Sequence, residues 1–164
     1  MQMKNLLTIY SLIAILVFAS CATSKETRSF TKDINGSWQL NTIVTEGVSG
    51  KFKAGIFNEA DFNCFVGSTW NFNADKKLGT YAIPASASEC STVTRNFKWS
   101  IYEAKDQPKI FEFRRLDNAL NEIDVNSGGY RFTIVQLGAN NMQLRSDISF
   151  EGKPAALVYN FVRI

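Results

Sequence analysis

The chain has 164 residues and a net charge of +3, from 18 Lys and Arg against 15 Asp and Glu, and it contains no histidine. This near balance argues against a nucleic-acid-binding protein, because such proteins carry a marked basic excess. The missing histidine excludes Ser-His-Asp and Cys-His catalytic systems and nearly every catalytic zinc site. No metal-ligand set or phosphate-binding glycine loop takes their place, so we expect no catalytic activity, no metal ion and no cofactor.

The first 20 residues are typical of a signal peptide. Lys4 precedes an apolar run over residues 6–18, which is shorter than the ~20 residues that span a bilayer. The run ends in Ala19-Ser20-Cys21, which resembles the bacterial lipobox. That resemblance implies that Cys21 becomes the first residue of the mature chain and carries a diacylglycerol. The alternative is an ordinary secretory signal that is cut near Ala22 and discards Cys21.

Lipidation of Cys21 predicts a protein of the cell envelope that is anchored to a membrane by its acyl chains. Two or more such chains hold a protein stably. Ala22 stands where the inner-membrane retention signal has Asp, which favours the outer membrane. Residues 21–33 are polar apart from Phe30, and we interpret them as a flexible tether to a domain at residues 34–164.

Within that domain, eight segments alternate apolar and polar residues, as half-buried strands do. Phe97, Trp99 and Ile101, for example, alternate with Lys98 and Ser100. The segments are residues 36–44, 67–74, 80–83, 93–103, 110–116, 130–137, 142–148 and 155–164. Short turns join most of them, which predicts an all-β fold, an eight-stranded antiparallel up-and-down barrel. A barrel of this size is either filled by side chains or holds one small ligand.

Gly36-Ser37-Trp38 opens the first predicted strand, and Arg163 lies near the end of the last one. A Gly-x-Trp at the first strand with a late Arg resembles the lipocalin pattern. Over residues 34–164 the chain resembles the lipocalin-like domains of small bacterial lipoproteins of the Bacteroidetes type. The resemblance implies that Trp38 closes the base of the barrel and that the Arg163 guanidinium lies on its ring. The alternative is that Trp38 is an ordinary core aromatic.

The chain has three cysteines, and lipidation of Cys21 leaves Cys64 and Cys90. An exported domain reaches an oxidising compartment, which favours a disulfide between these two residues. The alternative is a pair of buried free thiols.

Large aromatic residues recur on the faces that the alternation places inside the barrel. They are Trp70, Phe72, Tyr81, Trp99, Phe113 and Tyr130. In one interpretation they line a cavity for a small apolar or amphipathic ligand, residues 54–66 cover the open mouth as a lid, and the Tyr and Trp polar groups bind the ligand's polar end.

In the other interpretation the rings fill the lumen, and the loops form a protein–protein interaction module for an unidentified envelope partner. That module needs an exposed apolar patch at the loop end of the barrel. A lumen of about 300 Å³ or more would favour the ligand-binding interpretation.

Overall fold

A computed structural model describes residues 25–48, 53–85, 90–104, 106–123, 125 and 128–164. The predicted signal peptide, Cys21 and Ala22 lie outside this part of the chain. No helix within it is both long enough and apolar enough to cross a membrane.

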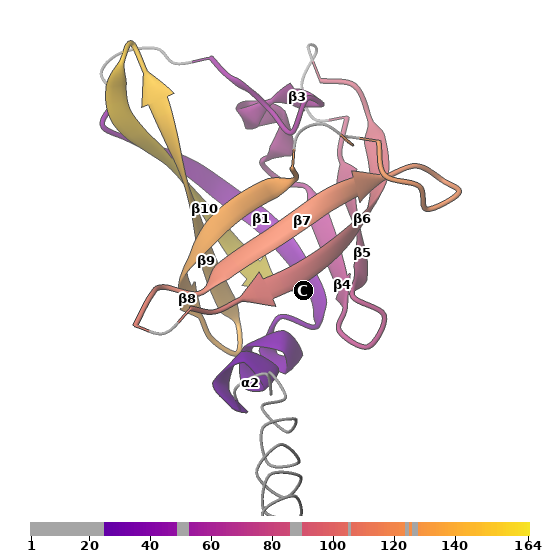
Figure 1. Cartoon of the computed structure of the whole chain (residues 1–164). Helices are drawn as coiled ribbons and strands as arrows, with labels where there is room; N and C mark the ends of the chain where they lie inside the picture. Colours follow the sequence, from indigo (N-terminus) through magenta and orange to yellow (C-terminus); the bar gives the residue numbers. More distant parts are fainter. Residues whose placement is uncertain (1–24, 49–52, 86–89, 105, 124, 126–127) are drawn as a thin grey trace, which may run out of the picture.

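Eight strands form one closed antiparallel barrel (Figure 1). They are β1 (Gly36–Glu46), β4 (Thr69–Asn73), β5 (Leu78–Ile83), β6 (Val93–Tyr102), β7 (Ile110–Leu116), β8 (Tyr130–Leu137), β9 (Asn141–Phe150) and β10 (Lys153–Arg163). Each strand pairs with the next one along the chain from β4 to β10, and β1 closes the ring by pairing with both β10 and β4. This strand order confirms the predicted eight-stranded up-and-down barrel. The strands form a barrel because alternating apolar and polar residues give a strand one face that can be buried.

The predicted alternation is interrupted in β8, where the pairing with β9 shifts register between Ile134 and Gln136, and in β10, where residues 155–159 are all buried. It is also interrupted in β1. Trp38 and Leu40 are fully buried, but the pairing with β10 shifts register between Leu40 and Thr42. Thr42 is therefore exposed, although strict alternation from Trp38 and Leu40 predicts that it faces inward. A bulge adds one residue to a strand and reverses the facing of the residues after it.

The structure forms helix α2 at Lys25–Asp33, within the segment expected to be a flexible tether. The tether interpretation is therefore wrong for this stretch. Phe30 packs against the barrel core and is followed one helical turn later by the fully buried Ile34. The Lys109 ammonium lies 4.6 Å from the centroid of the Phe30 ring. Together with Thr27, which is buried and donates a hydrogen bond to Glu103, these residues hold the helix against one end of the barrel, which we call the base (Figure 1).

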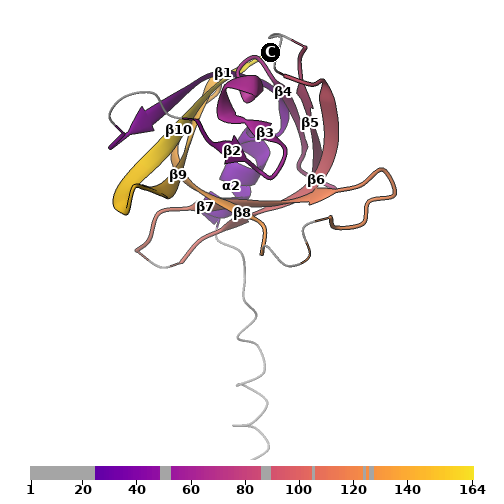
Figure 2. The ribbon, with the colours of Figure 1, turned by 90° about the horizontal axis from the view of Figure 1, so that it is seen from above.

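The connection from β1 to β4 lies over the opposite end of the barrel, which we call the mouth (Figure 2). It contains β2 (Gly55–Ile56), β3 (Ala60–Asp61) and the short 3-10 helix η2 (Phe62–Phe65). The position predicted for residues 54–66 is thus confirmed, and we keep the name lid segment for them. A disulfide with an S–S distance of 2.05 Å joins Cys64 of the lid segment to Cys90, before β6. Among the described residues, the hydrophobic core extends from Phe30 to Phe161, so residues 25–164 contain the closed barrel together with this core.

Candidate functional site

Arg163 and Trp38 meet at the base of the barrel. The Arg163 Cζ atom lies 4.1 Å from the centroid of the fully buried Trp38 ring, whose Nε1 donates a hydrogen bond to the Ile34 carbonyl at 2.8 Å. The guanidinium also donates to the main-chain carbonyls of Asp33, Asn35 and Ala139. The pair therefore joins the end of α2 and the turn between β8 and β9 to the last strand, as the sequence pattern implies, and its role is structural.

Gly36 is part of the same arrangement. Its φ of +113° is open to glycine and strained for other residues, and a Cβ atom there would lie 2.8 Å from Arg163 Nη1. The glycine of the Gly-x-Trp pattern is thus required by the close approach of the arginine that covers the tryptophan.

At the mouth, a three-residue turn between β2 and β3, residues 57–59, directs Phe57 into the barrel. The Glu59 amide donates to the Ile56 carbonyl at 3.1 Å across this turn. Phe57 and Asn58 have φ values of +57° and +49°. A left-handed conformation costs a residue other than glycine about 1–2 kcal/mol, and Phe adopts it rarely. Phe57 is nonetheless only 6% exposed, so the packing of its ring offsets this strain.

The Phe57 ring is surrounded by aromatic rings of the barrel and of η2. Their centroids lie between 5.1 and 6.3 Å from its own, mostly edge-on: Phe65, Trp70, Phe113, Tyr130, Phe132 and Tyr159. Burial raises the pKa of one of them, Tyr159, to about 12. At this level of the barrel the lumen is therefore occupied by a side chain of the lid segment.

The six residues predicted to line a ligand cavity fall into two groups. Trp70, Phe113 and Tyr130 contact Phe57, and Tyr81 stacks on Trp70 with 4.8 Å between ring centroids. The other two, Phe72 and Trp99, pack against each other at 5.7 Å nearer the base, where Phe72 pairs with Gly36.

The polar groups of these residues are directed at protein atoms. Trp70 Nε1 donates to Ser68 Oγ at 2.9 Å, and Trp99 Nε1 donates to the Leu78 carbonyl at 3.0 Å. Protein atoms thus accept the hydrogen bonds of both indole N–H groups, and the binding of a ligand by these groups stays a prediction.

Next to Phe57, the Glu59 carboxylate receives four hydrogen bonds from the barrel wall. Arg95 donates from Nη2 to Oε1 at 2.7 Å and from Nε to Oε2 at 3.0 Å. Arg115 Nη1 and the Tyr81 hydroxyl each donate to Oε2 at 2.8 Å. The side chains of Glu59 and Arg115 are only 8% and 7% exposed. We call these four residues the mouth cluster.

Sequence reasoning identified only Tyr81 in this cluster, although a signal for the two arginines was present. Arg95 stands two residues before the inward-facing Phe97, and Arg115 stands two residues after the inward-facing Phe113. The period-two alternation therefore places both guanidinium groups inside the barrel at its mouth. Glu59 gave no such signal, because it belongs to a short turn without periodicity.

The mouth cluster sets the ionisation of its members. Burial alone would raise the pKa of Glu59, but hydrogen bonds from Arg95, Tyr81 and Arg115 outweigh it and hold the pKa below its ordinary value of 4.5. Burial, and then the adjacent Glu59 carboxylate, raise the pKa of the Tyr81 hydroxyl well above its ordinary value. Glu59 is therefore ionised and Tyr81 is a neutral donor at neutral pH.

This depressed pKa predicts an acid-sensitive contribution to stability. A carboxylate with a lowered folded-state pKa stabilises the fold above its unfolded pKa near 4.5, and this contribution disappears as the pH falls through the folded value. We expect the difference in unfolding free energy between the wild type and Glu59→Gln to be largest above pH 5 and to shrink below pH ~4. Urea denaturation between pH 3 and 7 measures it, and a difference that is constant with pH would contradict the ion cluster.

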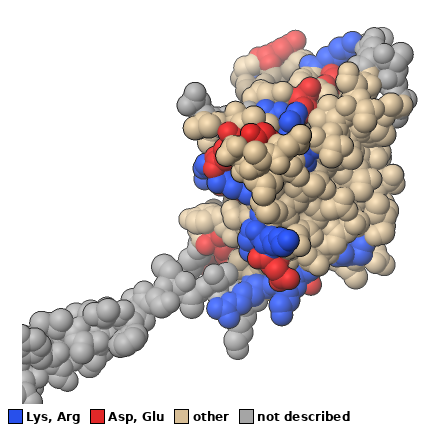
Figure 3. Space-filling model, turned by 90° about the vertical axis from the view of Figure 1, so that its right-hand side faces the viewer, with Lys and Arg blue, Asp and Glu red and all other residues tan. Residues whose placement is uncertain are grey.

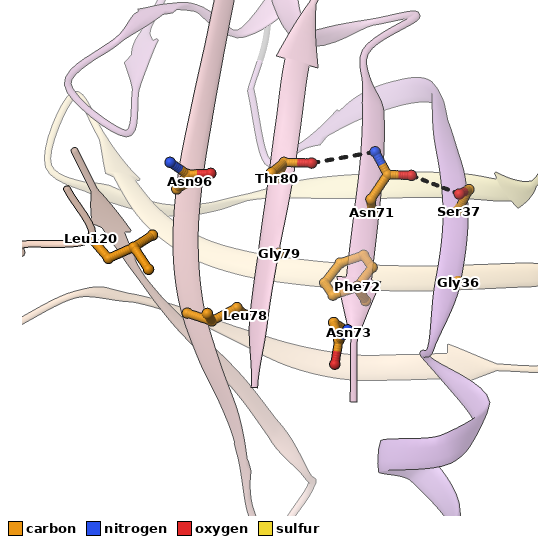
Figure 4. A pocket seen from close by; sticks show the side chains of 10 residues that line it. All are labelled: Gly36, Ser37, Asn71, Phe72, Asn73, Leu78, Gly79, Thr80, Asn96 and Leu120. Atoms are coloured by element: carbon orange, nitrogen blue, oxygen red, sulfur yellow. Dashed lines mark hydrogen bonds between the residues drawn. The ribbon is translucent and has the colours of Figure 1, made fainter. Parts of the chain in front are cut away.

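Two grooves of the size expected for a ligand lie on the outer wall. One of about 360 Å³ crosses β1, β4, β5 and β6, where Ser37, Asn71 and Thr80 form a row of hydrogen-bonded side chains and Leu120 lies at one side (Figure 4). Another, of about 400 Å³, lies over β5, β6 and β7 beside Lys98 and Arg114. Figure 3 shows the side of the barrel with β4, β5 and β6, where charged groups of both signs border a broad area without charge. By contrast, the lumen that the lid segment covers is packed with rings.

Comparison with known proteins agrees with this architecture. The family model for the lipocalin-like domain matches residues 34–144. A lipocalin-like protein from Bacteroides uniformis shares 16% identity, covering 80% of this chain and 99% of that one with a TM-score of 0.44. A bovine odorant-binding protein, in complex with a selenium-containing odorant, shares 14% identity over 82% of this chain and 75% of its own, with a TM-score of 0.41. No curated protein matches the chain. Since the family model spans more than half of the sequence, the chain belongs to the family of lipocalin-like domains.

Proposed function

We propose that this protein is a lipid-anchored binding protein of the cell envelope that takes up a small apolar or amphipathic molecule at the mouth of its barrel. The observation that carries the proposal is the position of Phe57. Its ring, held on a strained turn, occupies the aromatic-lined upper lumen, where an eight-stranded barrel has room for one small ligand. The ligand would enter in exchange for the Phe57 ring.

The hairpin that holds Phe57 is suited to such an exchange. Its two strands are two residues long and pair only at Gly55 with Asp61 and at Ile56 with Ala60. An isolated pair of strands is marginally stable, so this hairpin depends on its side-chain contacts with the barrel. A ligand that replaces those contacts releases the strain of the turn, which lowers the cost of opening.

The lipid anchor is the second part of the proposal. Cys21 precedes the start of α2 at Lys25 by only four positions. Since α2 lies at the base, acyl chains on Cys21 would hold the base at the outer membrane and leave the mouth on the far side of the barrel (Figure 1). A ligand would then enter and leave through the face turned away from the membrane.

A second candidate function, a protein–protein interaction module, is favoured by a different observation. The connection between β7 and β8 exposes three apolar side chains, with 51% of Leu120, 42% of Ile123 and 73% of Val125 accessible to solvent. This is the kind of apolar loop surface that such a module needs. In that case the packed lumen would serve only as a rigid support.

Mass spectrometry of the mature chain, purified from bacterial membranes, tests the proposal. Under native conditions we expect a retained mass of a few hundred daltons that is lost on denaturation. The denatured chain should begin at Cys21 and carry the added mass of its acyl groups. A bare protein that also fails to take up added amphiphiles would contradict the binding function, and a mature chain that begins after Cys21 would contradict the anchor.

A further inference from the structure

We propose that the molecule that replaces the Phe57 hairpin is an amphipathic carboxylate. Its apolar part would take the place of the Phe57 ring, and its carboxylate would take the place of Glu59 in the mouth cluster. This inference rests on the proposed function and adds the chemical class of the ligand. In the closed state, the hairpin itself would occupy the site with one apolar ring and one carboxylate.

The donors of the mouth cluster belong to the barrel wall and not to the moving hairpin. Tyr81 on β5 lies opposite Arg95 on β6, and Arg115 lies on the neighbouring strand β7 opposite Phe97. Regular strand pairing fixes the backbone positions of these three residues independently of the lid segment. When the hairpin leaves, the donors remain in place while their acceptor, Glu59, leaves with it.

The geometry of the donors suits a carboxylate. Arg95 presents Nε and Nη2 to the two oxygens of one planar group, while Arg115 and Tyr81 both approach Oε2 from other strands. Such paired donation from one guanidinium is the preferred way in which arginine binds carboxylates. A ligand carboxylate can accept the same four hydrogen bonds.

The carboxylate position and the ring position also share a wall. The Trp70 ring lies 6.2 Å from the Phe57 centroid and 4.8 Å from the Tyr81 centroid, and Tyr81 donates to Glu59. One small molecule with a charged head and an apolar tail can therefore fill both positions.

The cost of displacing Glu59 selects among ligands. A neutral amphiphile can replace the packing of Phe57, but it has no carboxylate to accept the hydrogen bonds that Arg95, Arg115 and Tyr81 donate to Glu59. Removing one partner of a buried ion pair is strongly unfavourable. An amphipathic carboxylate replaces both interactions, so it displaces the hairpin at lower cost.

The test compares decanoate with decanol, which share one apolar chain and differ in the head group. Binding to the oxidised chain without its first 21 residues is followed at pH 7 by tryptophan fluorescence and calorimetry. We expect decanoate to bind wild type at least about tenfold more tightly than decanol. Arg95→Met and Tyr81→Phe should each lower this ratio several-fold, because each removes a donor to the carboxylate.

Two further variants separate the carboxylate site from the closure of the hairpin. Glu59→Gln weakens the attachment of the hairpin but keeps all three donors, so it should strengthen binding of both ligands and preserve the ratio. Arg131→Met is the matched control, since Arg131 is an exposed residue that pairs with Glu112 on the outer face of the barrel, and it should change neither affinity.

The outcomes distinguish the binding function of the protein from the carboxylate chemistry of its ligand. Equal affinities for decanoate and decanol, or a ratio unaffected by Arg95→Met and Tyr81→Phe, would overturn the carboxylate inference and leave the binding function standing. Binding of neither ligand to wild type or to Glu59→Gln would overturn both. Circular dichroism of each variant verifies that the barrel is folded.

Discussion

Replacing Phe57 with Ala should lower the free energy of unfolding by about 3–5 kcal/mol, the usual cost of removing a core phenylalanine ring. The ring fills the space between the barrel wall and η2, and Ala at φ +57° keeps the backbone strain while losing the packing that offsets it. The remaining void would be lined by aromatic rings, and an apolar void of this kind takes up small apolar molecules. Urea denaturation measures the loss, and fluorescence titration with indole measures the gain in binding.

Phe57→Leu is the graded control for this variant. Leu keeps most of the apolar volume, so the loss of stability should be clearly smaller than for Ala, and indole should not bind. A loss below about 1 kcal/mol for Phe57→Ala would mean that the ring contributes little to the core. It would contradict the view that Phe57 is the side chain that closes the lumen.

Replacing Arg163 with Met should destabilise the base of the barrel by about 3 kcal/mol or more. The change removes a cation–π contact worth about 0.5–2 kcal/mol and charged hydrogen bonds to three carbonyl groups, each worth about 1.5–3 kcal/mol when measured singly. These contributions do not add fully, because they belong to one connected group. Thermal and urea unfolding followed by tryptophan fluorescence measure the effect.

Arg163→Lys distinguishes shape from charge at this position. A lysine keeps the positive charge but has neither the planar face for Trp38 nor donors in several directions. We therefore expect it to recover only a minor part of the lost stability. Full recovery by Lys would contradict a role that depends on the guanidinium plane.

Much of the barrel was predictable because a half-buried strand alternates apolar and polar residues, and this alternation is visible in the sequence. The predicted bounds of β7 and β8 are the observed ones, since the buried residues alternate along β7 and along β8 as far as Ile134. The bulge after Leu40 was not predictable, because one extra residue leaves no trace in an alternation of mixed residues. Helix α2 was also missed, since Phe30 and Ile34 are the only large apolar residues in this polar stretch of the sequence.

The candidate site was less accessible to sequence reasoning. The aromatic lining and the place of the lid segment were predicted, but the occupant of the lumen was not. Phe57 lies in a three-residue turn with positive φ at its first two positions, a geometry for which Gly and Asn are the usual signals. The strain of this backbone conformation is offset by the tertiary packing of the Phe57 ring. Residue propensities contain no information about tertiary packing, so the sequence did not predict this position.

For the mouth cluster, by contrast, the sequence does contain a signal of an ion pair inside the barrel. An arginine in the inward phase of a strand is expensive to bury unless a carboxylate meets it. Arg95 and Arg115 both stand at inward-facing strand positions, which predicts an acidic partner for them. Glu59 of the lid segment is that partner.

A crystal structure of the chain with decanoate would test the central claim most directly, because the ligand and the Phe57 hairpin compete for one place. We predict that the apolar chain lies among Trp70, Phe113 and Tyr130, that its carboxylate is bound by the arginines of the mouth cluster, and that Phe57 has left the lumen. Decanoate found in the outer groove over β4 and β5, with Phe57 still among the lumen rings, would contradict the claim.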